Sequence, residues 1–168
     1  MKDHYNVLFA CTENSARSIM AEALANQLGK GRVRAFSAGS RAGRAPHPLA
    51  LSVLSGAGIP VDGLRSKGWE EFTRAGSVEM DLVITVCDRA AAEPCPLWPG
   101  LPVTAHWSVP DPASVPGSEE QRQKAFSNTM QLLRHRISLL LALQPEGLDK
   151  LALQTRIGDI GKSRDATA

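Results

Sequence analysis

The chain has 168 residues, of which 43% are hydrophobic and 21% are charged, and its formal net charge is +2. The length and the balance of residues are those of a single globular domain. A charge so close to zero argues against the strongly basic surface of a nucleic-acid or membrane-surface partner. We also expect no transmembrane helix, because no stretch of about 18 consecutive apolar residues is present.

The sequence contains three cysteines, Cys11, Cys87 and Cys95. An odd number of cysteines cannot all pair within one chain. Residues 1–6 are polar, and the apolar run that follows them ends at Cys11. This run is too short for the hydrophobic region of a signal peptide. We therefore expect a reducing, cytoplasmic setting in which these thiols are free to react.

The first half of the chain alternates between strand and helix patterns. Residues 5–10 form an apolar, strand-like run, and residues 18–30 carry apolar side chains at helical spacing. The alternation in residues 33–38 predicts a second strand. A second helix is expected at residues 48–55, after a basic loop that contains glycine.

The middle of the chain predicts two more strands. A short amphipathic helix is expected at residues 69–73. Residues 81–86 are apolar on both faces, as in a central strand of a covered parallel sheet. Residues 88–102 form a polar, proline-rich segment, and residues 103–107 are predicted to be the fourth strand. Cys87 thus stands directly after a strand.

The last third of the chain is predicted to be helical. Ser118 and the two acidic residues after it resemble a helix N-cap, and a long helix is expected to run from there to about residue 143. Residues 148–160 return to helical spacing after a proline and a glycine. We expect a domain over residues 1–145 and a C-terminal helical extension over residues 146–168. The order of elements predicts an α/β, three-layer sandwich with a four-stranded parallel sheet flanked by helices.

The loop between the first strand and the first helix has the pattern Cys-x5-Arg-Ser, from Cys11 to Arg17 and Ser18. Backbone N–H groups of such a loop and of the helix start favour an anion. The planar guanidinium of Arg17 suits two oxygens of a tetrahedral oxyanion. The predicted oxyanion-binding residues are Thr12, Glu13, Asn14, Ser15, Ala16, Arg17 and Ser18. The positive field of these N–H groups and of Arg17 also predicts a depressed pKa for the Cys11 thiol, which would make Cys11 a thiolate nucleophile. The alternative is that Cys11 is a small buried hydrophobic residue.

Two further candidate residues follow predicted strands. Cys87 and Asp111 should lie at the same sheet edge as Cys11, because parallel sheets bind ligands at the carboxyl ends of their strands. Asp111 is a candidate general acid, and its alternative is a turn residue before Pro112. His106 is interpreted as structural. No metal site is expected, because the cysteines lack the close spacing of zinc ligands.

The loop and several later segments together resemble a known family. Residues 7–22 are similar to the nucleophile loop of the low-molecular-weight protein tyrosine phosphatase fold, and more narrowly to that of the arsenate reductases that use this fold. Residues 37–40, residues 81–88, Cys95-Pro96 and residues 105–113 match that branch in order. The resemblance covers about residues 5–143 and implies a four-stranded parallel sheet between helices.

The sequence departs from this family at three positions. Ala16 stands where some thioredoxin-coupled members carry a further cysteine, and Glu13 stands where many members have glycine. Glu13 adds a negative charge beside the expected anion site. Lys67 falls where some members offer a carboxylate to a monovalent cation.

The resemblance implies the reduction of arsenate, with Cys11, Arg17, Asp111, Cys87 and Cys95 as catalytic residues. Cys87 would attack the Cys11–arsenic adduct, and Cys95 would then take over the disulfide from Cys87. No bound cofactor is expected. The partners are an external thiol reductant (thioredoxin, or glutaredoxin with glutathione) and arsenate, with phosphate or sulfate as competing anions.

The alternative function is that of a phosphatase acting on phosphotyrosine or another phosphomonoester. Phosphate and arsenate have nearly the same shape, so the loop alone does not separate the two activities. Hydrolysis has no use for a second thiol, however, and a phosphotyrosine site needs aromatic walls. The chain has a single tyrosine, Tyr5, and alanine follows the Asp111-Pro112 pair. We therefore favour the reductase over the phosphatase and over a non-catalytic anion sensor.

Overall fold

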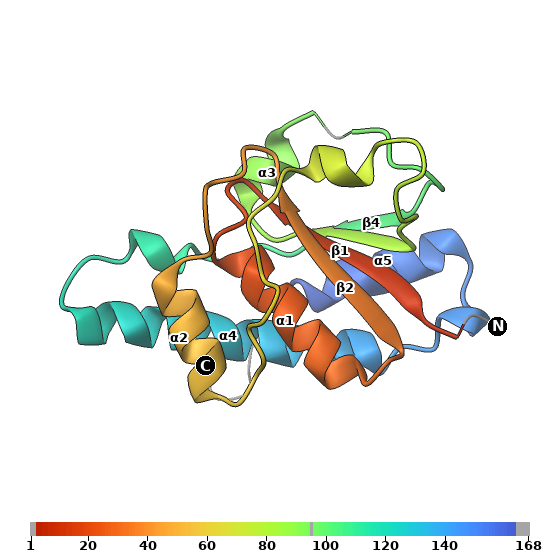
Figure 1. Cartoon of the computed structure of the whole chain (residues 1–168). Coiled ribbons are helices and arrows are strands. Elements are labelled where there is room, and N and C mark those ends of the chain that lie inside the picture. Colours follow the sequence, from red (N-terminus) through yellow and green to blue (C-terminus); the bar gives the residue numbers. More distant parts are fainter. Residues whose placement is uncertain (1–2, 95, 164–168) are drawn as a thin grey trace.

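The fold is built on four parallel strands in the order β2-β1-β3-β4 (Figure 1). The computed structural model describes residues 3–94 and 96–163. The strands are β1 (Tyr5–Cys11), β2 (Val33–Gly39), β3 (Leu82–Thr85) and β4 (Val103–His106). The predicted α/β class and the four-stranded parallel sheet are confirmed.

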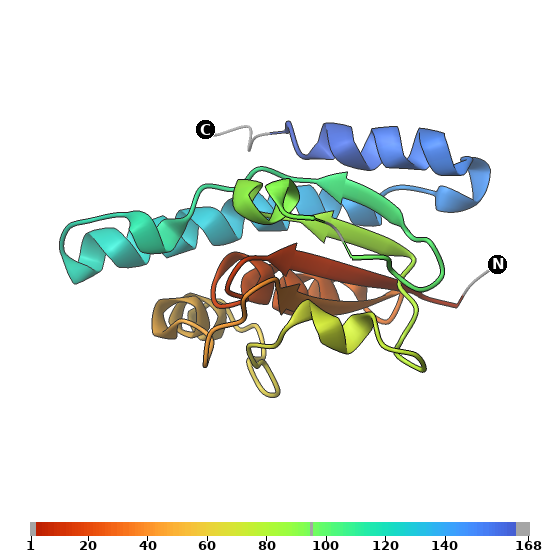
Figure 2. The ribbon, with the colours of Figure 1, turned by 90° about the horizontal axis from the view of Figure 1, so that it is seen from above.

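Helices cover both faces of this sheet (Figure 1 and Figure 2). Helices α1 and α4 lie along one face, with α5 beside α4 under β4, and the turn η1 lies against the other face. The α-helices are α1 (Arg17–Gly29), α2 (Pro48–Gly56), α3 (Asp88–Ala92), α4 (Glu119–Leu141) and α5 (Lys150–Ile160). The 3-10 turns are η1 (Trp69–Phe72), η2 (Pro112–Ser114) and η3 (Pro145–Gly147). In the described ranges, no helix is long and apolar enough to cross a bilayer.

The central strand β1 is buried on both faces, and its side chains alternate between two apolar clusters. Val7, Phe9 and Cys11 face the larger cluster, which contains residues of α1, α4 and α5. Leu8 faces the smaller cluster, which contains Phe72 of η1. The alternation places the Cys11 side chain on the α1 side of the sheet, because successive residues of a strand point to opposite faces.

Helix α3 is the main departure from the sequence prediction. Residues 88–102 were expected to be a polar, proline-rich segment, but Asp88–Ala92 form a short helix capped by Cys87. Three consecutive alanines have high helix propensity, and an acidic residue favours the first turn. The helix ends before Pro94, which cannot continue it.

The long helix α4 begins where the sequence predicted. The Ser118 hydroxyl accepts a hydrogen bond from Gln121 N at 3.2 Å, and the Gln121 side chain accepts one from Ser118 N at 2.8 Å. These two bonds form a capping box, which satisfies backbone N–H groups that the helix itself leaves unpaired.

Gly39, the last residue of β2, lies very close to the backbone of the loop that follows β1. A substitution of Gly39 therefore tests whether this contact supports the fold. A Cβ atom at residue 39 would overlap Thr12 O and would lie 3.0 Å from Asn14 N. We predict that Gly39→Ala lowers the free energy of unfolding by about 1–3 kcal/mol, the usual cost of forcing an atom into packed structure. Urea denaturation measures this change.

The matched control is Gly56→Ala at the end of α2, where an added Cβ meets no atom within 4 Å. We expect its stability to be unchanged or slightly higher, because alanine reduces the entropy of the unfolded chain. Equal urea midpoints for the two variants would mean that β2 does not press against the loop.

Candidate active site

The candidate site lies at the carboxyl edge of the sheet, where β1 and β3 end side by side. Cys11 is the last residue of β1, and Arg17 is the first residue of α1. The strands β1 and β3 pair in parallel, with Ala10 opposite Thr85, and Val86 N donates to Ala10 O at 2.8 Å. Cys87 therefore follows its strand immediately beside the loop that begins at Cys11.

The carbonyl groups of the loop are held on its outer side. Four of them accept hydrogen bonds of 2.8–3.0 Å from backbone N–H groups of the segment 40–47: Cys11 from Ser40, Thr12 from Arg41, Glu13 from Gly43 and Ser15 from His47. The carbonyl of Asn14 accepts a bond from the Ser66 hydroxyl at 2.6 Å. In a trans peptide, the C=O of one residue opposes the N–H of the next. The N–H groups of residues 12–16 therefore point to the side opposite these bonds, an arrangement that can hold an anion. We call this side of the loop the cradle.

Asn14 holds the loop in an unusual backbone conformation. Its φ of 52° is left-handed, a region that asparagine tolerates better than most residues. The side-chain nitrogen Nδ2 of Asn14 donates to Ser18 Oγ at 2.8 Å, and Asn14 Oδ1 accepts a hydrogen bond from Lys67 N at 2.9 Å. Asn14 therefore ties the loop both to α1 and to the segment around Lys67.

Lys67 carries a buried ammonium next to this tie. Its Nζ lies 3.0 Å from Arg65 O and 3.4 Å from both Glu22 Oε1 and Ser37 Oγ. Burial lowers the pKa of Lys67, while the carboxylate of Glu22 works in the opposite direction. The ammonium is thus surrounded by three oxygen atoms.

The Cys11 sulfur is enclosed by the cradle, with 3% of the residue exposed. Its Sγ lies 2.8 Å from Ser18 Oγ and 3.2 Å from Asn14 N. Burial raises the pKa of the Cys11 thiol, and the neighbouring Cys87 adds to the increase, whereas the hydrogen bonds from Ser18 and Asn14 lower it. The predicted depressed pKa of Cys11 is therefore wrong. Burial removes water from the sulfur, and this loss, which no residue spacing reveals, outweighs the hydrogen bonds that favour the thiolate.

Arg17 contacts the segment that carries Asp111. Arg17 Nη1 donates to Val109 O at 3.0 Å, and its Nη2 lies 3.9 Å from Asp111 Oδ2. Asp111 also caps η2, since its carboxylate accepts bonds from Ala113 N at 3.0 Å and from Ser114 Oγ at 2.9 Å. Asp111 thus has the geometry of a turn residue and also lies beside the candidate anion-binding guanidinium.

Cys87 is buried beside the loop and caps α3. Its Sγ lies 3.4 Å from Thr12 Oγ1 and accepts a bond from Ala90 N at 3.3 Å. Sequence reasoning assigned Thr12 only to the oxyanion loop and missed this contact. Of the other loop residues, Ala16 and Ser18 are buried, Ser15 is half-buried and Glu13 is exposed. Cys95 lies outside the described residues.

A group of polar contacts joins α3 to β4 and to the residues that follow β4. His106 Nε2 lies 2.7 Å from Asp88 Oδ1, its Nδ1 lies 2.7 Å from Thr85 Oγ1, and the Ser108 hydroxyl donates to Asp88 Oδ2 at 3.3 Å. The bond from His106 lowers the pKa of Asp88. Among residues 3–94 and 96–163, no group of three or more His, Cys, Asp or Glu side chains is arranged to hold a metal ion.

The comparisons with known proteins agree with this geometry. The family model for low molecular weight phosphotyrosine protein phosphatases matches residues 6–152. A "Glutaredoxin arsenate reductase" of Synechocystis sp. is 30% identical over 81% of this chain and 95% of its own length. An "Arsenate reductase" of Bacillus subtilis is 31% identical over 78% of this chain and 91% of its own length.

A solved structure described as an arsenate reductase in the phosphate binding state has a TM-score of 0.63 and 27% identity, and the match covers 82% of this chain and 97% of that one. The order of the strands, the Cys-x5-Arg loop at the edge of the sheet and these similarities lead to one conclusion. The chain belongs to the low molecular weight phosphotyrosine protein phosphatase family, on the branch of the arsenate reductases.

Proposed function

We propose that this protein reduces arsenate to arsenite with Cys11 as the nucleophile and with Cys87 and Cys95 as relay thiols. The observation that carries the proposal is the second buried thiol, Cys87, whose sulfur lies 3.4 Å from the Thr12 hydroxyl of the nucleophile loop. Hydrolysis of a phosphate ester has no use for this thiol, whereas reduction requires one. The names of the similar proteins support the same reaction.

The N–H groups of the cradle and Arg17 would bind the arsenate oxygens. Arg17 has five N–H donors, and its contacts with Val109 O and Asp111 leave others for the anion. Phosphate and sulfate have the same tetrahedral shape and would compete. A related structure in a phosphate binding state supports a cradle of this kind.

In the first chemical step, the Cys11 sulfur attacks arsenic and one arsenate oxygen departs as water. The Ser18 hydroxyl and the N–H of Asn14 stabilise the thiolate that attacks. Asp111 is the proposed general acid, because its carboxyl group lies 3.9 Å from Arg17 Nη2, beside the guanidinium that would bind the anion. Its proton goes to the departing oxygen.

In the second step, the Cys87 sulfur attacks the Cys11 sulfur of the adduct. A Cys11–Cys87 disulfide forms, and the electron pair of the sulfur–arsenic bond moves to arsenic. Arsenic(V) thus becomes arsenic(III) and leaves as arsenite, while the two sulfurs supply the two electrons. Cys95 then attacks Cys87, which frees the Cys11 thiolate and leaves a Cys87–Cys95 disulfide.

An external thiol, from thioredoxin or from glutaredoxin with glutathione, would reduce this last disulfide. The protein itself would need no bound cofactor. A reducing compartment such as the cytoplasm would supply the reductant.

The relay predicts that Cys87→Ser separates two activities. Arsenate turnover with thioredoxin or glutaredoxin should be lost, because no thiol is left to attack the adduct. Hydrolysis of an aryl phosphate should persist, because that reaction uses only the cradle and Cys11. As a control, Cys11→Ser should abolish both activities. Continued arsenate turnover by Cys87→Ser would rule out the relay.

The role of Asp111 as general acid predicts a large kinetic effect of its amide. Asp111→Asn should lower kcat for arsenate reduction by about 10²–10⁴-fold, the usual contribution of a general acid. Steady-state assays with arsenate measure this change. Ser114→Ala is the control, because it removes one hydrogen bond to Asp111 but keeps the carboxyl group. If Asp111→Asn is as active as this control, Asp111 is only a turn residue.

Burial of Cys11 predicts the pH dependence of its alkylation in the free protein. The rate should rise with pH and reach half its maximum above the ordinary thiol pKa of about 8.5, because burial favours the neutral thiol. Ser18→Ala should move the midpoint further up, since it removes a bond that lowers the pKa, and Cys87→Ser should move it down. Mass spectrometry of the Cys11 peptide measures these rates. A wild-type midpoint below 8.5 (about that of a free cysteine) would show that Arg17 and the loop dipoles outweigh burial.

A further inference from the structure

We propose that helix α5 holds the acid loop, defined as residues 107–111, in its working position, and that Trp107 and Arg136 are positioning residues of the site. The inference rests on the proposed role of Asp111. The family match ends at residue 152, so most of α5 lies beyond the part of the chain that the family model covers. The support from α5 is therefore argued from the contacts of this chain alone.

The first contact joins α5 to the start of the acid loop. Trp107 is completely buried, and its indole N–H donates to Ile157 O in α5 at 2.9 Å. Just beyond α5, a Cβ atom at Gly161 would lie 2.6 Å from Trp107 Cδ1 and 2.8 Å from His106 O. The backbone at the end of α5 thus lies directly on the backbone at the end of β4, and it leaves no room for a side chain at residue 161.

The second contact is a buried cation between two backbone carbonyls. Arg136 in α4 is 5% exposed, and its Nη1 donates to Ser108 O at 2.8 Å while its Nε donates to Ser163 O at 3.2 Å. Ser163 follows α5, and its hydroxyl lies 2.8 Å from His135 Nε2. One guanidinium therefore links the acid loop with the segment after α5.

The other side of the acid loop faces the catalytic groups. Val109 O accepts a bond from Arg17 at 3.0 Å, and the Ser108 hydroxyl donates to Asp88, next to Cys87, at 3.3 Å. Asp111 ends the same loop, 3.9 Å from Arg17. A movement of α5 that displaces Trp107 or Ser108 is thus passed along the acid loop to the proposed acid, Asp111. The position of Arg17 is set independently, because Arg17 is the first residue of α1.

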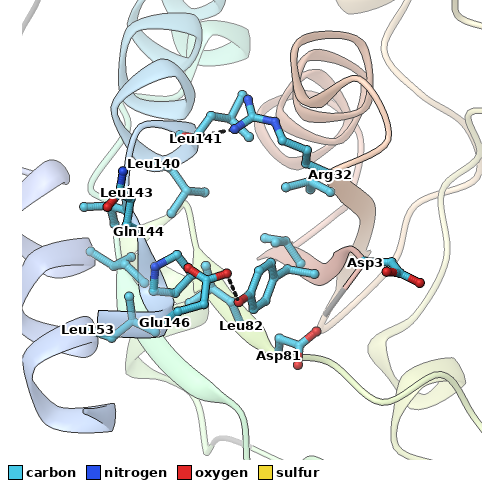
Figure 3. Close-up of a pocket in the computed structure, with 15 residues that line it drawn as sticks. Asp3, Arg32, Asp81, Leu82, Leu140, Leu141, Leu143, Gln144, Glu146 and Leu153 are labelled. Atoms are coloured by element: carbon cyan, nitrogen blue, oxygen red, sulfur yellow. Dashed lines mark hydrogen bonds between the residues drawn. The ribbon is translucent and has the colours of Figure 1, made fainter. Parts of the chain in front are cut away.

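The packing of α5 is uneven along its length. A cavity of about 490 Å³ lies between its beginning, η3 and the amino end of the sheet (Figure 3). Leu153, Leu140 and Glu146 line it. Tyr5 is another lining residue, and its hydroxyl donates to Glu146 Oε1 at 2.9 Å. The close contacts of α5 are therefore at its carboxyl end, beside the site, and its beginning is packed more loosely.

Two glycines of the same segment provide a matched test. Gly161→Ala places a methyl group against Trp107 and His106, whereas Gly158→Ala places one where no atom lies within 4 Å. The assay uses the full chain with two substrates. The phenolate that leaves phenyl phosphate needs a proton on its oxygen, whereas the 2,4-dinitrophenolate that leaves 2,4-dinitrophenyl phosphate is a stable anion without one. In both cases the phosphoryl group passes to the Cys11 sulfur.

We expect Gly161→Ala to lower kcat for phenyl phosphate by about 10–100-fold, the effect of a small misplacement of a catalytic group. Its kcat for dinitrophenyl phosphate and its KM for both substrates should stay within about twofold of the wild type. Gly158→Ala should match the wild type on both substrates. A purely structural role of α5 would not produce this dependence on the leaving group.

The inference is overturned if the two glycine variants behave alike, or if Gly161→Ala slows both substrates equally. Should Gly161→Ala fail to fold in a thermal melt, Trp107→Phe decides instead, because it keeps a ring but removes the N–H that reaches Ile157 O. The same selective loss is expected for it, and its absence overturns the inference. If the wild-type protein turned over neither arsenate nor aryl phosphates, the proposed function would be refuted, and the role of α5 with it.

Discussion

The site depends on one constraint, which is that the carbonyl groups of residues 11–15 are bonded from outside the loop. The segment 40–47 and Ser66 supply the donors, so the chain after β2 wraps around the loop and fixes it. Because each peptide unit is planar, this outer layer of bonds also orients the N–H groups on the opposite side of the loop. The cradle is thus organised in advance, and Arg17 is the cationic side chain of the loop itself.

Burial and hydrogen bonding have opposite effects on the pKa of Cys11. The sulfur is enclosed deeply enough that desolvation favours the neutral thiol, while short bonds from Ser18 and Asn14 favour the thiolate. The same enclosure brings Cys87 and Thr12 next to the nucleophile loop. The burial that favours the neutral thiol of Cys11 is therefore shared with Cys87, the proposed second thiol of the relay.

The strands and the long helix could be predicted because their signals are local. The run at residues 81–86 is apolar on both faces, and the Ser118 cap precedes α4 directly. Helix α3 was missed because five residues are too few to show a helical period. The contact between Thr12 and Cys87 joins positions 75 apart, and the bond from Arg136 to Ser108 joins positions 28 apart. No spacing in the sequence encodes such contacts, which arise only when the strands are ordered in the sheet.

Ser108 has a consequence for how this site tolerates change. Its carbonyl is bound by Arg136, its hydroxyl binds Asp88 beside Cys87, and its neighbour Val109 binds Arg17. One short stretch therefore supports both the anion-binding end of the site and the helix that begins at the second thiol. Substitutions near Ser108 will combine non-additively, since residues that share partners are coupled. The proposed anion binding and the proposed disulfide exchange are thus not independently adjustable here, whether by natural drift or by engineering.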